Sequence, residues 1–207
     1  MQAIMRDGWA WPAADQIAYE HIKLYVPLLR FAARQAKKHR VAIQAGGNAG
    51  MYPAILAGMF GKVYTFEPAQ ENLKCLYENV PENVEVREGV LGDRTDSVGI
   101  ALPVGLFPDG SEGVNTGAYQ VHGEGSIAQF RIDDMDLGCL DFLQLDVEGY
   151  ELNALKGGRF TIDRYSPVIM LESFHNGTDA ASFLTGLGYQ RLVKGAYDQV
   201  WVREDVV

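Results

Sequence analysis

The 207-residue sequence is poor in cysteine, with Cys75 and Cys139 as the two that it contains. Two cysteines without paired spacing predict neither a disulfide framework nor a cysteine-ligated metal site. The sequence also lacks an uncharged apolar run long enough to span a bilayer, and its start lacks the basic and apolar regions of a secretory signal. We therefore expect no membrane partner and a cytoplasmic location.

Basic residues are the minority charge, since 18 Lys and Arg face 27 Asp and Glu, for a formal net charge of −9. An acidic surface repels phosphate backbones, so nucleic acid is not an expected partner. The one basic cluster, over residues 34–40, is interpreted as a solvated helix end whose cations suit the negative pole of the helix dipole.

The remaining composition is that of a globular domain, with 47% hydrophobic and 22% charged residues in a length that fits one domain. Strands and helices alternate along it. Strands are expected at 41–45, 62–66, 84–88, 141–146 and 168–171, and helices at 51–60, 69–79, 150–156 and 179–187. This alternation predicts a single-domain α/β fold whose mostly parallel sheet is covered on both faces. A tight turn between 189–193 and 199–202 predicts a final antiparallel hairpin, and so a reversed terminal strand.

Two regions depart from the alternation. Residues 1–40 are expected to form an N-terminal helical segment, with a helix over 13–39 that Pro27 divides or kinks, ahead of a main domain over 41–207. Residues 97–132 read as an inserted strand and loop region around a glycine-rich stretch at 103–126. A long loop inside a compact domain is usually functional. We expect the inserted region to border the substrate cleft, and the alternative is a surface hairpin. All these segments are expected to form one globular unit.

The most informative stretch runs from Ala42 to Gly50, where an apolar strand leads into a loop of glycines and Asn48. A helix follows with Pro53 in its first turn, where a missing N–H costs nothing. Glycine lets backbone N–H groups approach a ligand closely. The next strand ends at Glu67, a carboxylate able to accept hydrogen bonds from two ribose hydroxyls. This order, in which a strand is followed by a glycine loop, a helix, a second strand and an acid, is typical of the opening unit of a nucleotide-cofactor fold.

This unit is compatible with a nicotinamide, a flavin or S-adenosylmethionine. The strict G-x-G-x-x-G pattern is absent, because the glycines lie at 46, 47 and 50. A Tyr-x-x-x-Lys pair exists at Tyr19 and Lys23, but it precedes the glycine loop, unlike that of a short-chain reductase. The reversed terminal strand favours a methyltransferase sheet.

Three stretches then resemble motifs of the FkbM-type methyltransferases, in the family's order over residues 40–175. The stretch 43–50 resembles the family loop D-x-G-A-N-x-G, and Phe66-Glu67-Pro68 with Asn72, Leu76 and Asn79 resembles F-E-P…N…L…N. Residues 143–151 and 155–157 resemble K-I-D-V-E-G-x-E…L-K-G, and 167–172 matches the strand that follows. The resemblance implies a Rossmann-like class I methyltransferase fold, S-adenosylmethionine as methyl donor, and O-methylation of a sugar, glycan or small-metabolite hydroxyl.

The resemblance also implies a set of cofactor-binding residues. Glu67 is expected to hold the ribose, Val90 to form an apolar wall for the adenine, and Asp146 to lie under the amino group or near the sulfonium. The whole expected set is Gln44, Gly46, Gly47, Asn48, Gly50, Glu67, Pro68, Glu88, Gly89, Val90 and Asp146. The structural alternatives are a tight turn for the glycines and a helix N-cap for Glu67.

An alcohol acceptor benefits from a base that removes its proton. His175, just past the fifth strand, is the predicted base, with Glu172 or Asp146 beside it. The alternative for His175 is a surface histidine in a loop. His122 is a weaker candidate, and His21 and His39 are interpreted as structural. No metal site is predicted.

One departure from the family motifs concerns function. Gln44 stands where the family has an acid that helps to hold the ammonium of the cofactor. The loss of a charge-assisted hydrogen bond weakens binding by about 1–2 kcal/mol unless Asp146 compensates. The alternative function is therefore a protein that binds the cofactor without transferring its methyl group; a nicotinamide oxidoreductase is a third hypothesis. The acceptor and the oligomeric state are left open.

Overall fold

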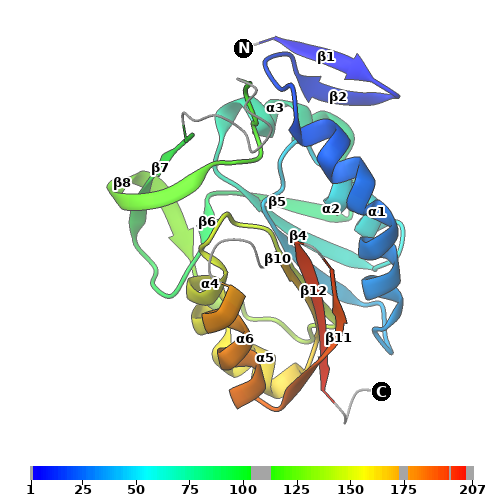
Figure 1. The fold of residues 1–207 in the computed structure, drawn as a ribbon, viewed down its shortest axis with the longest axis vertical. Coiled ribbons are helices and arrows are strands. Elements are labelled where there is room, and N and C mark those ends of the chain that lie inside the picture. Colours follow the sequence, from blue (N-terminus) through cyan, green and yellow to red (C-terminus); the bar gives the residue numbers. More distant parts are fainter. Residues whose placement is uncertain (1, 104–112, 173–176, 196, 204–207) are drawn as a thin grey trace.

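The computed structural model describes residues 2–103, 113–172, 177–195 and 197–203. Its centre is a seven-stranded sheet with the order β11-β12-β10-β9-β3-β4-β5 (Figure 1). The strands are β3 (Val41–Ala45), β4 (Lys62–Glu67), β5 (Val84–Glu88), β9 (Phe142–Leu145), β10 (Val168–Glu172), β11 (Tyr189–Lys194) and β12 (Asp198–Arg203). β12 runs antiparallel to both of its neighbours, whereas β5, β4, β3, β9 and β10 are parallel. The predicted reversed terminal strand is confirmed, and it lies between β10 and β11 rather than at the edge.

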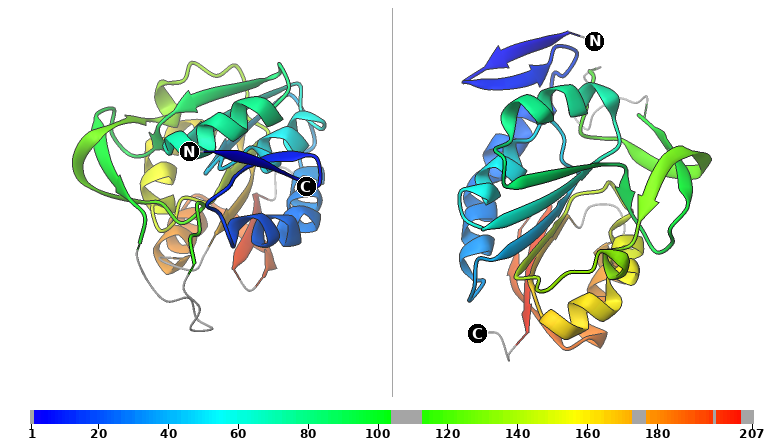
Figure 2. Two further views of the ribbon diagram at one scale, coloured as in Figure 1. Left: turned by 90° about the horizontal axis from the view of Figure 1, so that it is seen from above. Right: turned by 180° about the vertical axis from the view of Figure 1, so that it is seen from behind.

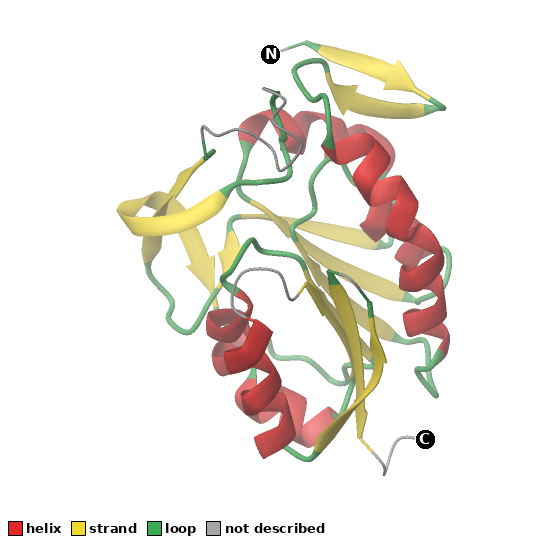
Figure 3. Cartoon of the chain, in the orientation of Figure 1, coloured by secondary structure: helices red, strands yellow, loops and turns green. Residues whose placement is uncertain are grey.

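Helices cover both faces of this sheet (Figures 1 and 3). They are α1 (Ala18–Arg34), α2 (Met51–Ala57), α3 (Gln70–Asn79), α4 (Glu151–Gly157), α5 (Arg159–Tyr165) and α6 (Gly177–Gly186). Successive strand residues point to opposite faces, which divides the core in two. Ala42 and Phe142 pack with Leu29 of α1, whereas Ile43 and Leu143 pack with Leu155 of α4. The single-domain, mostly parallel α/β fold is thereby confirmed.

The N-terminal region differs from the predicted helical segment. β1 (Ala3–Arg6) and β2 (Trp9–Pro12) form an antiparallel hairpin that packs against α3. Its turn is Asp7-Gly8, both at positive φ, +48° and +88°. α1 begins later than expected and contains Pro27 within one helix rather than a break between two. α5, which was not predicted, starts directly after the Gly157-Gly158 pair that ends α4.

The inserted region forms a small sheet beside the main one (Figure 2). β7 (Ser97–Ala101) pairs antiparallel with β8 (Gln120–Phe130), and β6 (Val90–Leu91) pairs parallel with the end of β8. The inserted region expected at 97–132 thus contains one long strand, β8, that pairs at its two ends with β7 and β6. A 3-10 turn, η1 (Ile132–Asp134), leads back to the main sheet. In the part of the chain that is described, no helix combines the length and apolar character needed to cross a bilayer.

Candidate functional site

The glycine loop between β3 and α2 lies at the carboxyl ends of the parallel strands. The amides of Gly46 and Gly47 both donate to the carbonyl of Phe66, at 3.1 and 2.9 Å. Gly46 has a φ of +84°, and a Cβ added there would lie 1.9 Å from the carbonyl oxygen of Asp146. Glycine is therefore required at 46, because the loop touches the backbone that leaves β9. Gly50, with a φ of +96°, is the N-cap of α2.

Glu67, the last residue of β4, ties this loop to the next helix. Its Oε2 accepts from the amide of Asn48 at 2.7 Å, and its Oε1 accepts from the amide of Ala69 at 2.9 Å and from Asn72 Nδ2 at 3.1 Å. The side chain is only 4% exposed. Burial raises the pKa of Glu67 to about 7, against the opposing effect of these three donors. Glu67 is thus an anchor of the loop as well as part of the cavity described below.

The two asparagines of the second motif act as clamps. Asn72 Nδ2 also donates to the carbonyl of Thr116 at 2.8 Å, which draws the segment before β8 over Glu67. Asn79 Nδ2 donates to the carbonyls of Ala49 and Ala10, at 2.6 and 2.7 Å, and its Oδ1 accepts from the Ala10 amide at 2.9 Å. These contacts join the glycine loop to the N-terminal hairpin.

Gln44, which replaces the acid of the family motif, is used inside the loop. Its Nε2 donates to the carbonyl of Gly46 at 2.8 Å, and its Oε1 accepts from Thr65 Oγ1 at 2.5 Å. The side chain is fully buried, so both polar atoms are satisfied by the protein itself. Gln44 supports the loop from behind, rather than lining the cavity in front of it.

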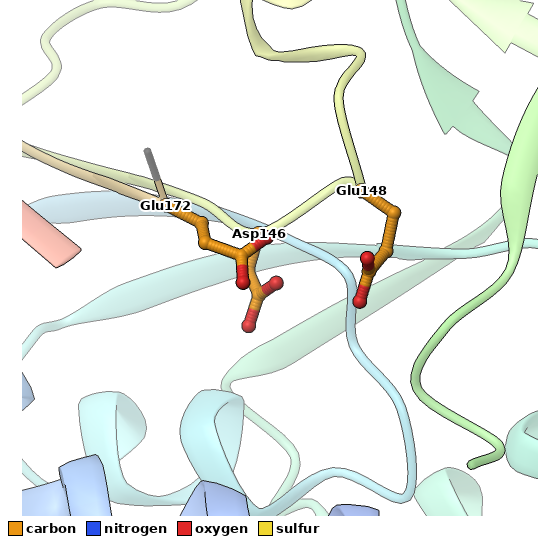
Figure 4. A group of neighbouring side chains, drawn as sticks. All are labelled: Asp146, Glu148 and Glu172. Carbon is orange, nitrogen blue, oxygen red and sulfur yellow. The ribbon is translucent and has the colours of Figure 1, made fainter. Parts of the chain in front are cut away.

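Three acidic side chains come together where β9 and β10 end (Figure 4). Oxygen atoms of Asp146, Glu148 and Glu172 lie within 4.8 Å of one another. Burial, followed by the neighbouring carboxylates, raises the pKa of Asp146 well above its usual value and that of Glu172 to about 10. Oε2 of Glu172 has no hydrogen-bond partner among the described residues. When no ligand is bound, carboxyl groups this close together share protons. They favour the binding of a positively charged ligand. Its oxygens are of the kind that hard divalent cations take, and the absence of a metal stays a prediction.

The loop, Glu67 and the acidic group face one cavity of about 1120 Å³. The predicted cofactor residues in its wall are Gly46, Asn48, Glu67, Pro68, Val90 and Asp146, and the predicted catalytic Glu172 lies there too. The structure does not place Gln44, Gly47, Gly50, Glu88 or Gly89 in this wall. Glu88 is exposed at the end of β5 and accepts from the hydroxyl of Tyr77 at 3.0 Å. His175 lies outside the described residues.

Other lining residues were not predicted as site residues. They come from the start of α1, from the end of β7 and the two residues after it, from the segment 113–121, from Val147 and Glu148 after β9, and from Tyr197. The described part of the inserted region lines this cavity, and its role at a substrate cleft stays a prediction. His21, interpreted as structural, lies in the wall, and its ring centroid is 5.8 Å from that of Tyr197.

Besides Glu172, three side chains in the wall keep buried polar atoms without a partner among the described residues: Asn48 Nδ2, Asn72 Oδ1 and Thr116 Oγ1. Their exposed fractions are 4%, 1% and 0%. Buried polar groups are normally hydrogen-bonded, so unpaired ones in a cavity indicate a polar ligand. One donor (Asn48 Nδ2), one acceptor (Asn72 Oδ1) and one hydroxyl that can do either (Thr116 Oγ1) lie in the same wall as Glu67, and together they suit the hydroxyls and ring nitrogens of an adenosyl group.

The strand order, the reversed β12 and a cavity at the carboxyl ends of the strands define the class I methyltransferase fold. The chain belongs to the FkbM methyltransferase family, since the model of the methyltransferase FkbM domain matches residues 44–191. No curated protein matches the sequence.

Solved structures with the same fold include methyltransferase FkbM from Methylobacillus flagellatus KT, with a TM-score of 0.54 and 17% identity. That match covers 88% of this chain, which spans 59% of the length of the FkbM structure. Precorrin-6y C5,15-methyltransferase from Geobacter metallireducens GS-15 has a TM-score of 0.50 and 14% identity, over 92% of this chain and 99% of its own. A third structure is magnesium protoporphyrin IX methyltransferase from Synechocystis PCC 6803, solved with bound S-adenosylmethionine. It has a TM-score of 0.52 and 11% identity, over 90% of this chain and 81% of its own.

Proposed function

We propose that this protein transfers a methyl group from S-adenosylmethionine to a hydroxyl of a sugar, a glycan or another small metabolite. The observation that carries the proposal is one cavity whose wall contains residues of all three family motifs: Gly46 and Asn48, Glu67, and Asp146. The motifs lie far apart in the sequence and meet at a single edge of the sheet. Ligands of open α/β sheets bind at this edge.

The residues of the cavity fit the proposed cofactor. Glu67 and the unpaired polar atoms of Asn48, Asn72 and Thr116 would hold the ribose and the adenine, with Val90 as an apolar wall. Asp146 and Glu172 would face the positively charged amino and sulfonium groups. Gln44 does not oppose this assignment, because its amide supports the loop through Gly46 and Thr65.

In the proposed reaction the cofactor supplies an electrophilic methyl group. The acceptor oxygen forms the new bond to that carbon as the carbon–sulfur bond breaks, with the electron pair going to sulfur. The protein orients the two reactants, which supplies much of the rate enhancement. The hydroxyl proton passes to Glu172 or Asp146. A positive charge beside this group lowers the pKa of both carboxyls and so prepares them as bases. His175 stays a predicted alternative base.

Calorimetric titration with S-adenosylmethionine, S-adenosylhomocysteine and NADH tests the cofactor. We expect the two adenosyl compounds to bind with one site per chain and NADH not to bind. Transfer of labelled methyl groups to hydroxylated acceptors then separates an enzyme from a cofactor-binding protein without activity. Binding with no transfer in a broad acceptor screen would support the second function, and binding of NADH alone would overturn both.

A further inference from the structure

The cavity has room for an acceptor beside the cofactor. Its volume of about 1120 Å³ exceeds the ~1,000 Å³ upper end of ordinary small-molecule sites. The motif residues form part of its wall, and the remaining wall, or second side, comes from α1, Tyr197 and the segments around β7 and β8. The acidic group of Asp146, Glu148 and Glu172 lies in the same wall. The second side is therefore the place for the acceptor.

The side chains on this second side are mainly apolar. The apolar ones are Ile17, Ala18 and Ile22 at the start of α1, Ile100, Leu102 and Pro103 near β7, and Val114, Ala118 and Val121 near β8; the segment before β8 also contributes the polar Asn115, Thr116, Tyr119 and Gln120. The rings of His21 and Tyr197 add an aromatic wall, with Tyr25 packed against both at centroid distances of 5.0 and 6.2 Å. Such a surface suits a ring or an aliphatic chain rather than a densely hydroxylated sugar.

The charge of the wall has one sign. Four carboxylic residues line the cavity, and no lysine or arginine does so among the residues that the structure describes. The stretches outside the description, residues 1, 104–112, 173–176, 196 and 204–207, contain no lysine or arginine either. A phosphate, sulfate or carboxylate would therefore enter without a cation to pair with. An anion that leaves water for a partly buried site loses favourable hydration, and without a cationic side chain nothing in the wall compensates for that loss.

We infer that the methyl acceptor carries no anionic group and presents an apolar ring or chain next to the hydroxyl that is methylated. The inference rests on the proposed function and narrows its acceptor. It excludes nucleotide-linked and phosphorylated sugars, acyl thioesters of anionic carriers, and carboxylic acids. Neutral and amine-bearing hydroxyl compounds remain, and the carboxylic residues favour the amines.

Three phenols that differ in one group provide the test: tyrosol (neutral), tyramine (cationic) and 4-hydroxyphenylacetate (anionic). Their dissociation constants are measured by ligand-observed NMR on the protein saturated with S-adenosylhomocysteine. We expect tyrosol and tyramine to bind at millimolar concentrations, and the anion to bind at least about tenfold more weakly, or ~1.4 kcal/mol. Equal or tighter binding of the anion would overturn the inference, and so would the failure of both other compounds to bind. Failure of S-adenosylhomocysteine itself to bind would instead count against the proposed function.

A charge placed in the wall provides the second arm. Val121→Lys adds a cation to the apolar side, and Val121→Met is the matched control of similar length. We expect the lysine variant to bind 4-hydroxyphenylacetate about tenfold more tightly than the methionine variant does, with tyramine binding weakened. Unchanged selectivity in a folded Val121→Lys protein that still binds S-adenosylhomocysteine would show that the charge of the wall does not select the acceptor.

Discussion

Gln44 of β3 lies directly opposite Gln144 of β9 in the parallel register, and both side chains are fully buried. The FkbM motifs described above have an acid at the first of these positions and a lysine at the second. The chain thus replaces both members of a potential buried ion pair by neutral amides. Gln44 finds partners in Gly46 and Thr65, whereas neither polar atom of the Gln144 side chain has a partner among the described residues. This point of the sheet therefore buries two neutral amides side by side.

This pairing predicts strong coupling between the two positions. Gln44→Asp alone buries a carboxylate with no cation beside it, and we expect it to lower the free energy of unfolding by about 3–5 kcal/mol. Gln144→Lys alone has a similar cost. The double variant restores an ion pair and should recover most of the loss, as measured by urea denaturation. Additive losses in the double variant would contradict the pairing.

Gln144→Met is the control for this cycle. It removes an amide whose polar atoms lack partners and fills the space with an apolar chain of similar length. We expect stability to be unchanged or slightly increased, because an unsatisfied buried amide costs about 1–3 kcal/mol.

Binding of the cofactor should be sensitive even to a conservative substitution of Glu67. In Glu67→Gln, an NH₂ group must face either the Asn48 amide or the donors from Ala69 and Asn72. We therefore expect S-adenosylmethionine to bind at least about 1.5 kcal/mol more weakly in Glu67→Gln and in Glu67→Ala, the scale of hydrogen bonds to a charged group. Calorimetry measures the change, and thermal unfolding of the free protein separates loop damage from lost ligand contacts. An unchanged dissociation constant would remove Glu67 from the cofactor site.

The raised pKa of Glu172 predicts how stability depends on pH. Its folded-state pKa of about 10 lies far above the ~4.3 of an unfolded glutamate, so between these values the folded state holds the extra proton. The contribution of Glu172 to the stability of the free protein is therefore greatest below pH ~4, and it declines as the pH rises toward 10. We expect the melting temperature to fall less steeply between pH 7 and pH 9 in Glu172→Gln than in the wild type. If the melting temperatures of the two proteins changed in parallel with pH, Glu172 would not titrate in this way.

The backbone contact between Gly46 and Asp146 predicts a position-specific effect of one methyl group. Gly46→Ala would place Cβ 1.9 Å from the Asp146 carbonyl oxygen, at a φ of +84° that disfavours side chains. We expect a loss of about 2 kcal/mol or more in unfolding free energy, together with loss of cofactor binding. Gly58→Ala is the control, because its Cβ would meet no atom closer than 3.4 Å. Its stability should stay within about 0.5 kcal/mol of the wild type.

The main sheet was predictable because its signals are local. Strands such as Val41–Ala45 are short apolar runs that a glycine or an acid brings to an end. Gly46 comes directly after β3, and Glu67 is the last residue of β4. The N-terminal hairpin also had a local signal that was missed. Asp7-Gly8 between two short strands is a strong hairpin turn, since both residues accept positive φ.

Other features could not be read from the sequence because they depend on long-range contacts. Pro27 stays inside one helix since α1 packs against the sheet through residues such as Leu29, and this packing outweighs the lost hydrogen bond. The contribution of α1 and Tyr197 to the cavity arises only when segments more than 170 positions apart are folded together. The same holds for the pairing of Gln44 with Gln144, which requires the strand order.

Asp15 connects the N-terminal segment to the roof of the cavity, and it provides the last prediction. This fully buried carboxylate accepts from Trp11 Nε1 at 2.8 Å and from the amides of Ala18, Tyr19 and Thr116, each at 3.1 Å. Thr116 is in turn held by Asn72, the partner of Glu67, so a buried chain of hydrogen bonds connects Asp15 to the proposed cofactor site.

Asp15→Asn keeps the size of the side chain but turns an NH₂ group toward one pair of these donors. We expect a lower melting temperature and also weaker binding of S-adenosylmethionine, because the segment at Thr116 loses its anchor. Asp7→Asn is the matched control in the same segment, since Asp7 Oδ2 accepts from Lys23 Nζ at 2.6 Å and from the Tyr19 hydroxyl at 2.9 Å, and the asparagine oxygen can still accept from both. Exposed ion pairs contribute little, so this variant should change neither quantity. If Asp15→Asn lowered the melting temperature but bound the cofactor with unchanged affinity, the N-terminal segment would be a purely structural support, without influence on the cofactor site.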